Sequence, residues 1–414
     1  MVFGLTHLHS IYALICKYPL IPKTNSNRSR NKDSKQAVSW MLDKDNLPSS
    51  QYLLRKAGPK EDAPENDDVK VAILDTGLDG KHPLLLPAPF GEDWGARVKD
   101  IISFDIHGNM IANRFRATSS EWQEVPWSQE GWDIYTDDDG HGTHVAGLVL
   151  QVAPNAEIYI AQVSRTRDQG LKPSTVQKVC LRPCVAREKT DLFQAIEHAI
   201  NIWKVDIISM SFGFEYEDNA LKKTIEDHWG DAVIIAAAGN QGGNNHGIAF
   251  PANLDRVIGI KATDSYGNNS TFNTWGPGTF QTLGENVLSM WRSYKEKGNV
   301  ILQQRSSGTS VATPIAAGIA ALVLEFTRQP EDRNDGTGYL KLCRERINND
   351  GRTEAMKRIF YGMSKSKGKG AREYRYIVPW NVLRAGRSNK ANHSDRLMAA
   401  MELWNFLENP HMYL

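Results

Sequence analysis

The chain has few cysteines, no long apolar run and little net charge, and each shortage argues against a class of protein. Its 414 residues include four cysteines, too few for a disulfide scaffold of this length. Cys180 and Cys184 are spaced for a local disulfide or for half a metal site. No second Cys or His pair lies near them in the sequence, so reduced thiols are favoured over a zinc site. No uninterrupted apolar run reaches the roughly eighteen residues of a membrane span, and no span is predicted.

The formal net charge is +1, which predicts no nucleic acid or other acidic partner for the chain as a whole. Basic residues are nevertheless concentrated at the two ends, in residues 1–35 and 341–396. Two interpretations stay open for these ends. Solvated tails are favoured over binding sites for an anionic partner.

The first residues do not form a typical signal peptide. A short apolar run, Ile11 to Cys16, lies between His9 and Lys17. A signal peptide needs about ten apolar residues followed by a small-residue cleavage site. The expectation is an intracellular protein, with secretion as the alternative.

Composition divides the chain into three regions. Residues 1–68 are polar and contain linker-like stretches, residues 69–326 form a compact core, and residues 327–414 form a basic, helical appendix. Hydrophobic residues make up 41% of the chain, which suffices for the core of one large domain.

Near-continuous apolar runs alternate with helical patterns within the core. The runs cover residues 69–74, 156–163, 206–211, 232–238 and 256–260. This alternation predicts an α/β fold with a mostly parallel central sheet and helices on both faces. Functional residues of such sheets gather at the carboxyl ends of the strands. Asp75 and Asn240 both follow such runs.

Asp75 and His141 are candidates for an acid and a base. Asp75 either caps a turn or accepts a hydrogen bond from His141, which would fix the imidazole tautomer. His141 begins a helical segment and lies between two glycines. It could pair with His144 on a metal, but Gly and Thr lie between the two histidines, so His144 is interpreted as structural. The preceding acids, residues 137–139, are interpreted as an exposed turn.

Ser310 and Asn240 are candidates for a nucleophile and an oxyanion donor. Ser310 opens the helical segment 311–326, so it either caps that helix or serves as a nucleophile at its positive end. Pro314 is expected in the first turn of this helix, where proline is tolerated. Asn240 either occupies a turn or, with the Ser310 backbone N–H, donates to a developing oxyanion.

Taken together, these segments resemble the subtilisin-like serine endopeptidases, the subtilases. The resemblance rests on residues 75–77, 141–147, 238–240 and 308–314, in the family order Asp, His, Ser, and covers about residues 69–326. It implies a three-layer α/β sandwich with a triad of Asp75, His141 and Ser310 and with Asn240 as oxyanion donor. The implied reaction is peptide-bond hydrolysis through an acyl-enzyme on Ser310. No cofactor or metal is expected, and calcium is not predicted because no acidic loop matches a family site.

The resemblance also implies a binding site for an extended polypeptide. Ser211, Phe212 and Gly213 resemble the segment that pairs with the substrate backbone. Ala237, Ala238 and Gly239 resemble one wall of the primary specificity pocket, and residues 248–252 resemble its far end. Small residues in the wall leave room for a sizeable side chain, so an apolar or aromatic residue is expected before the scissile bond.

The chain departs from the family pattern in several places, and the 68 residues before the core show no obvious strand–helix–strand pattern of a propeptide. Residues 281–287 lack the usual Ala-Pro-Gly, and residues 118–133 form an insertion with three tryptophans. The insertion is interpreted as a packed loop rather than an extra wall of the cleft. The alternative function is a subtilase-like effector or regulatory binding module with little turnover.

Overall fold

A computed structural model describes most of the core and part of the C-terminal region. The described residues are 68–85, 97–104, 110–113, 136–164, 184–242, 247–276, 279–296, 299–329, 338–368, 374–383 and 393–409. The expectations for residues 1–67, the insertion 118–133 and Cys180 lie outside these ranges.

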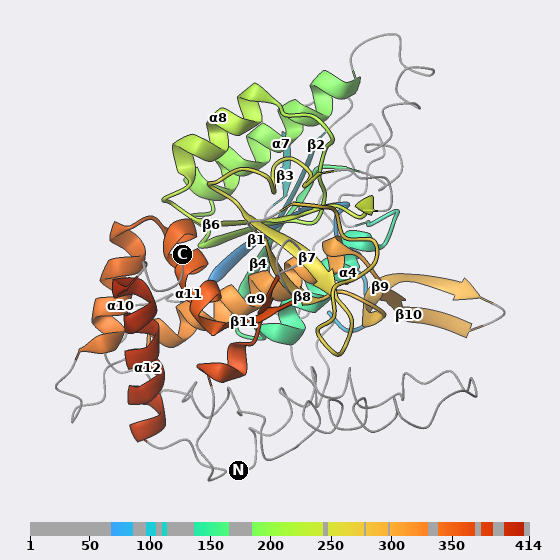
Figure 1. Ribbon diagram of the computed structural model, residues 1–414. Helices are drawn as coiled ribbons and strands as arrows, with labels where there is room; N and C mark the ends of the chain where they lie inside the picture. Colours follow the sequence, from blue (N-terminus) through green and yellow to red (C-terminus); the bar gives the residue numbers. More distant parts are fainter. Residues whose placement is uncertain are drawn as a thin grey trace, which may run out of the picture.

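One ten-stranded sheet organises the described part of the chain (Figure 1). Its strands run in the order β11-β12-β8-β7-β6-β5-β1-β4-β2-β3, and neighbours are parallel except for the pairs at the two ends. The strands are β1 (Lys70–Asp75), β2 (Val98–Phe104), β3 (Met110–Asn113), β4 (Glu157–Gln162), β5 (Ile207–Met210), β6 (Val233–Ala237), β7 (Ile258–Thr263), β8 (Phe280–Leu283), β11 (Ser364–Lys367) and β12 (Tyr374–Ile377).

Both faces of this sheet are covered, which explains why its central strands are apolar at most positions. Alternate residues of β1 point to opposite faces: Val71 and Ile73 belong to one hydrophobic cluster, and Ala72 and Leu74 to another. The predicted α/β fold with a mostly parallel sheet is therefore confirmed.

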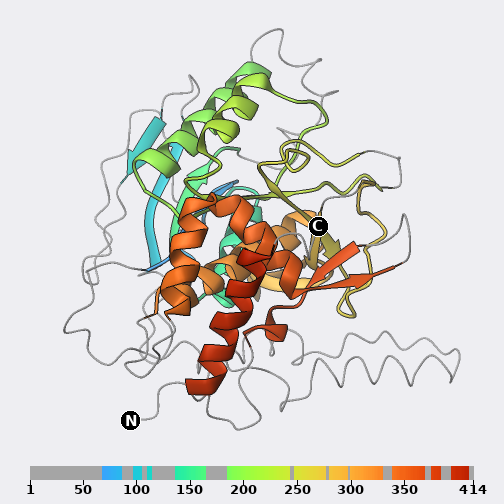
Figure 2. The same cartoon turned by 60° about the vertical axis from the view of Figure 1, so that its left-hand side comes forward.

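The helices form the two outer layers (Figures 1 and 2). Helices α7 (Cys184–Asn201) and α8 (Asn219–His228) cover one face. Helices α4 (His141–Val152) and α9 (Thr309–Thr327) pack together on the other. The remaining helices are α10 (Tyr339–Asn349), α11 (Arg352–Met363), the short 3₁₀ helix η4 (Pro379–Asn381) and α12 (His393–Glu408).

Helix α9 is the one described helix that is long and apolar enough to cross a membrane. Its composition is that of a core helix, because 83% of the apolar window is buried inside the protein. It packs on α4 and on strands β5 to β8. The helix therefore owes its apolar sequence to the core that it fills.

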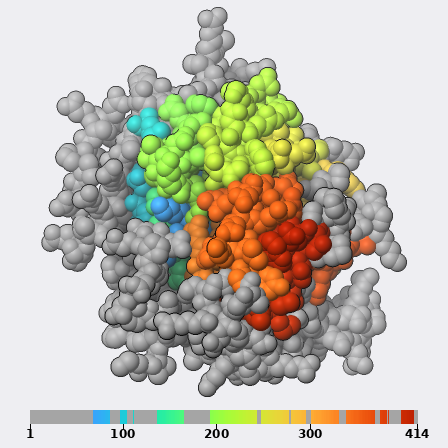
Figure 3. Space-filling model, turned by 90° about the vertical axis from the view of Figure 1, so that its left-hand side faces the viewer, coloured from blue at the N-terminus to red at the C-terminus, as the bar shows by residue number. Residues whose placement is uncertain are grey.

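The C-terminal segment is joined to the core by both hydrogen bonds and charge. Strand β12 extends the main sheet by pairing in parallel with β8, and β11 pairs with β12. Asp206, which is buried, accepts hydrogen bonds from Arg328 at 2.5 Å and from Arg352 at 2.7 Å. Figure 3 shows the C-terminal helices, in orange and red, lying beside the green α7 and α8 layer. The division of the chain at residue 326 stays a prediction.

A separate two-stranded hairpin projects beside α4 (Figure 1). It consists of β9 (Val287–Glu296) and β10 (Asn299–Ser306), paired antiparallel. Strand β9 lies against α4, and β10 ends shortly before Ser310. The hairpin thus packs on α4, which carries the candidate base, and leads along the chain into α9, which carries the candidate nucleophile.

Candidate active site

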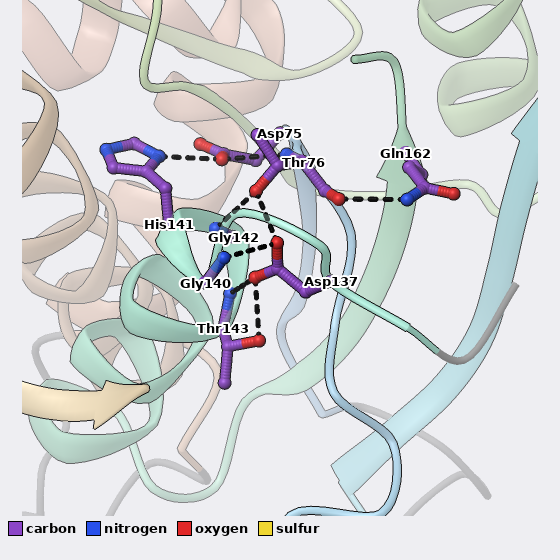
Figure 4. A network of polar contacts seen from close by, with 8 residues as sticks. All are labelled: Asp75, Thr76, Asp137, Gly140, His141, Gly142, Thr143 and Gln162. Atoms are coloured by element: carbon purple, nitrogen blue, oxygen red, sulfur yellow. Dashed lines mark hydrogen bonds and ion pairs between the residues drawn. The ribbon is translucent and has the colours of Figure 1, made fainter. Parts of the chain in front are cut away.

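Asp75 and His141 form a buried pair at the carboxyl edge of the sheet (Figure 4). Asp75 is the last residue of β1 and His141 is the first residue of α4. Asp75 Oδ1 lies 2.7 Å from His141 Nδ1, and the two residues are 4% and 2% exposed. An ionised carboxylate can only accept, so the ring proton lies on Nδ1 and Nε2 is left as an acceptor.

Asp137 holds the start of α4 in place, which corrects the prediction that residues 137–139 form an exposed turn. Asp137 is only 3% exposed. Its Oδ1 accepts from the Thr76 hydroxyl and the Gly140 N–H, and its Oδ2 accepts from the N–H and the hydroxyl of Thr143, all at 2.8 Å. A carboxylate is favoured here because it faces the N–H groups at a helix N-terminus. Of the three acids, Asp138 is exposed and Asp139 is partly exposed.

The loop after β1 and the start of α4 touch through backbone. The Thr76 hydroxyl accepts from the Gly142 N–H at 2.8 Å, and a Cβ on Gly142 would lie 2.2 Å from the Gly77 carbonyl oxygen. Only glycine permits this approach. The glycine after His141 is therefore needed to bring the histidine within reach of Asp75.

His144 is a structural residue, as the sequence predicts. Its Nε2 lies 3.1 Å from the Val287 carbonyl, and its ring makes an edge contact with Trp291. These contacts fix α4 to the hairpin. Within the described ranges, no group of three or more His, Cys, Asp or Glu side chains is placed to hold a metal ion.

Ser310 is the second residue of α9, and the interpretation of this serine as the helix cap is wrong. Gly308 is the N-cap, with φ of +154°, and as a glycine it has no side chain with which to cap the helix. The Ser310 N–H is among the first four of the helix and has no intrahelical acceptor. Its hydroxyl and its N–H are thus both available at the positive end of the helix.

Pro314 lies beyond the first turn of α9, contrary to the prediction. It is the sixth residue of the helix and cannot donate to the Ser310 carbonyl four residues earlier. In the same turn the Thr313 hydroxyl donates to the Thr309 carbonyl at 2.8 Å. The proline therefore removes a backbone hydrogen bond directly behind Ser310.

Asn240 lies against the N-terminus of α9. Its Oδ1 accepts from the Thr309 N–H at 2.8 Å, which leaves Nδ2 as the free donor of the amide. The Thr309 hydroxyl accepts from the Gly239 N–H at 3.1 Å and so closes the contact from the other side. A Cβ on Gly308 would lie 3.1 Å from Ser310 Oγ and 3.2 Å from Asn240 Nδ2. The absence of that Cβ leaves the space between the hydroxyl and the amide open.

The segments that resemble the substrate site lie at the same sheet edge. Ser211 to Gly213 follow β5, and Ala238 follows β6. Strand β5 lies between β1 and β6 in the sheet. Ser211, Ala237 and Ala238 are buried, whereas Phe212, Gly213 and Gly239 are partly exposed.

The structure thus brings Asp75 to His141 and Asn240 to the start of α9. Sequence reasoning missed Asp137 and its partners Thr76 and Thr143. The available signal was an acid three residues before the N-cap glycine, with a threonine three residues after it.

Comparison with known proteins gives matches across this region. The model of the subtilase family matches residues 66–337. Subtilisin DY of Bacillus licheniformis is 33% identical over 206 residues, which are 47% of this chain and 66% of that protein. The thermostable alkaline protease of Halalkalibacterium halodurans is 33% identical over 225 residues, 52% of this chain and 53% of that protein.

Among solved structures, that of the prenylagaramide maturation protease PagA aligns with a TM-score of 0.47 and 22% identity, over 87% of this chain and 99% of that one. The chain spans about half to two thirds of the length of the two curated relatives.

Proposed function

The chain belongs to the subtilase family, and we propose that it is a serine endopeptidase that hydrolyses peptide bonds through an acyl-enzyme on Ser310. The observation that carries this proposal is the 2.7 Å contact between Asp75 and His141. A buried carboxylate and imidazole in direct contact, at the carboxyl edge of a parallel sheet, are suited to activate a hydroxyl.

His141 is proposed as the general base. Its Nδ1–H is held by Asp75, so Nε2 takes the proton from the attacking hydroxyl. Nε2 is buried and has no hydrogen-bond partner among the described residues. The imidazolium that forms is stabilised by the adjacent carboxylate, which keeps its own charge throughout.

Ser310 is proposed as the nucleophile. Its Oγ attacks the peptide carbonyl carbon and the carbonyl oxygen becomes negative. Asn240 Nδ2 and the Ser310 N–H are the proposed donors to that oxyanion, and the N-terminus of α9 adds its positive potential. The contact of Asn240 Oδ1 with the Thr309 N–H supports this role, because it orients the amide before substrate arrives.

The cycle ends with proton return and hydrolysis. His141 gives its proton to the leaving amine, and the C–N bond breaks to leave an ester on Ser310. A water molecule then attacks the ester carbon while His141 takes its proton. The bond from that carbon to Ser310 Oγ breaks, His141 returns the proton to Oγ, and the acid product is released. Groups of the chain itself and water carry every step, so the proposed reaction uses no cofactor.

The proposed substrate is a polypeptide in extended conformation. Ser211 to Gly213 would pair with its backbone, and Ala237 to Gly239 would line the pocket for the side chain before the scissile bond. Backbone pairing gives affinity for many sequences, and the pocket selects among them.

The direct test is cleavage of an unfolded polypeptide by the purified protein and by its Ser310→Ala variant. We expect new peptide termini, identified by mass spectrometry, with the wild type alone. Equal cleavage by both proteins would contradict the role of Ser310. Binding of the polypeptide by both proteins without cleavage would favour the alternative, a binding module with little turnover.

A further inference from the structure

Residues 249 and 250 join the two segments that line the proposed specificity pocket. The backbones of Phe214 and Phe250 exchange hydrogen bonds at 2.7 and 2.9 Å. The Ala249 N–H donates to the Ala238 carbonyl at 3.0 Å. The position of Ala249 is therefore fixed relative to both walls at once.

The methyl group of Ala249 lies between two glycines, one in each wall. A Cβ on Gly213 would lie 2.6 Å from Ala249 Cβ, and a Cβ on Gly239 would lie 3.4 Å from the same atom. A side chain on Gly213 would therefore collide with the methyl group, and one on Gly239 would be in van der Waals contact with it. The space that their missing side chains leave is partly filled by Ala249.

Thr274 narrows the same space from a second side. Its Cγ2 would lie 3.0 Å from a Cβ on Gly239. Its hydroxyl donates to the Ala238 carbonyl at 2.8 Å, which fixes the side chain in this orientation. The methyl groups of Ala249 and Thr274 therefore both occupy space next to Gly239.

The proposed pocket borders the surface of the protein. Gly213, Gly239 and Ala249 are all partly exposed, whereas Ala237 and Ala238 beside them are buried. A substrate side chain that enters between the two glycines meets the Ala249 methyl group. A small side chain fits above that methyl, and an aromatic ring needs the volume that it occupies.

We propose that this protein cleaves after small residues, alanine, glycine or serine, and that Ala249 sets this limit. The proposal rests on the proposed endopeptidase function. It differs from the expectation of an apolar or aromatic residue, which rests on the resemblance of residues 237–239 and 248–252 to the pocket of the family. That expectation did not use the distances from the Ala249 methyl group to Gly213 and Gly239, which come from the structure.

The test compares two fluorogenic peptides that differ only in the residue before the scissile bond, alanine or phenylalanine. We expect kcat/KM of the wild type to be at least about tenfold higher for alanine, since one carbon in a pocket is worth about 10–200-fold. In Ala249→Gly, the ratio should shift at least about tenfold towards phenylalanine. Ala232→Gly is the matched control, because it removes a buried methyl beside the other end of β6 and should leave the ratio unchanged.

A wild-type preference for phenylalanine, or an unchanged ratio in Ala249→Gly, would overturn the inference. If Ala249→Gly does not fold, Ala249→Val decides: it should lower cleavage after alanine more than cleavage after glycine, and equal effects would overturn the inference. A protein that reacts with a fluorophosphonate at Ser310 but cleaves neither peptide overturns the inference alone. A folded protein without that reaction overturns the proposed function.

Discussion

Asp137 and Thr143 are joined by two hydrogen bonds to a single carboxylate oxygen. Asp137 Oδ2 accepts from both the backbone N–H and the hydroxyl of Thr143 at 2.8 Å. The Thr143 hydroxyl in turn accepts from the Asp79 N–H at 2.9 Å. Because His141 lies in the same first turn of α4, this contact determines where the imidazole meets Asp75.

Replacement of Asp137 should therefore lower the catalytic rate, although Asp137 is not proposed to contact substrate. In Asp137→Asn, the amide NH₂ takes the place of a carboxylate oxygen that accepts two hydrogen bonds, so it faces groups that can only donate or that donate in the wild type. We expect unfolding free energy to fall by about 1–3 kcal/mol, the penalty for a buried polar group left unsatisfied. We also expect kcat to fall about tenfold with little change in KM, because a displaced His141 affects the reaction more than binding.

Peptide kinetics and urea unfolding check this prediction, with unfolding measured in a Ser310→Ala background to prevent self-digestion. Asp138→Asn, a change at the exposed neighbour, is the control and should behave as wild type. A loss of stability with kcat unchanged would show that Asp137 supports the fold but does not position His141.

Asp75→Asn separates the two interpretations of Asp75. An asparagine can still cap the turn, since its side-chain oxygen can accept from the Thr76 N–H as Asp75 Oδ1 does at 2.8 Å. It cannot hold the imidazole in the same tautomer, and the same change in a trypsin triad lowers kcat by about 10⁴-fold. We expect a loss of that order with a normal thermal unfolding temperature. Wild-type kcat in this variant would support the turn-capping role alone.

Asn240 should act on the transition state and not on substrate binding. We expect Asn240→Ala to lower kcat by about 10²–10³-fold with KM nearly constant; that magnitude was measured in subtilisin, a relative of this chain. Asn240→Asp keeps an oxygen for the Thr309 N–H but lacks the Nδ2 donor, so it should lose at least as much. Recovery of activity in Asn240→Asp would mean that Asn240 only positions the start of α9.

Lys261 should make stability depend on pH in the alkaline range. It is buried in β7, its Nζ donates to the Gly276 carbonyl at 2.8 Å, and burial lowers its pKa to about 8. Between pH 8 and about 10.4, the pKa of an ordinary lysine, the unfolded chain binds a proton that the folded protein does not. Stability therefore rises with pH in this window, by at most about 3 kcal/mol from this residue.

Urea unfolding at pH 7 and pH 10.5 checks this prediction in the Ser310→Ala background. We expect Lys261→Met to be more stable than its parent at pH 7, and the difference to shrink at pH 10.5. A difference that is the same at both pH values would mean that folding does not lower the pKa of Lys261.

The central strands could be predicted because each is buried on both faces. The runs before Asp75 and Asn240 are apolar at nearly every position, and strands β1 and β6 follow them closely. The same argument predicts that residues after parallel strands meet at one edge. It holds for Asp75, which ends β1, and for Ser211, which follows the neighbouring strand β5.

Features that depend on distant partners could not be predicted from local pattern. Asp137 stands in a run of three acids, which is typical of an exposed turn, and its burial depends on Thr76, a residue 61 positions away. The surroundings of Ala249 are a second case, because Ala249 meets Gly213 and Gly239 only after β5 and β6 are side by side.

The C-terminal strands illustrate a third limit. Residues 365–370 are rich in Lys, Gly and Ser, a composition typical of a loop, yet residues 364–367 form β11. Their backbone is paired with β12, which in turn pairs with β8. An edge strand on the surface needs no apolar side chains, so its sequence carries little signal.

The most direct test of the account is reaction of a fluorophosphonate probe with the purified protein. The probe reacts with a serine hydroxyl only where a base and oxyanion donors are assembled around it. We predict stoichiometric labelling of the wild type at Ser310, identified by peptide mass spectrometry, and none of Ser310→Ala. A folded wild type that is not labelled, or labelling that persists in Ser310→Ala, would contradict the proposal that Asp75, His141 and Ser310 form a working catalytic triad.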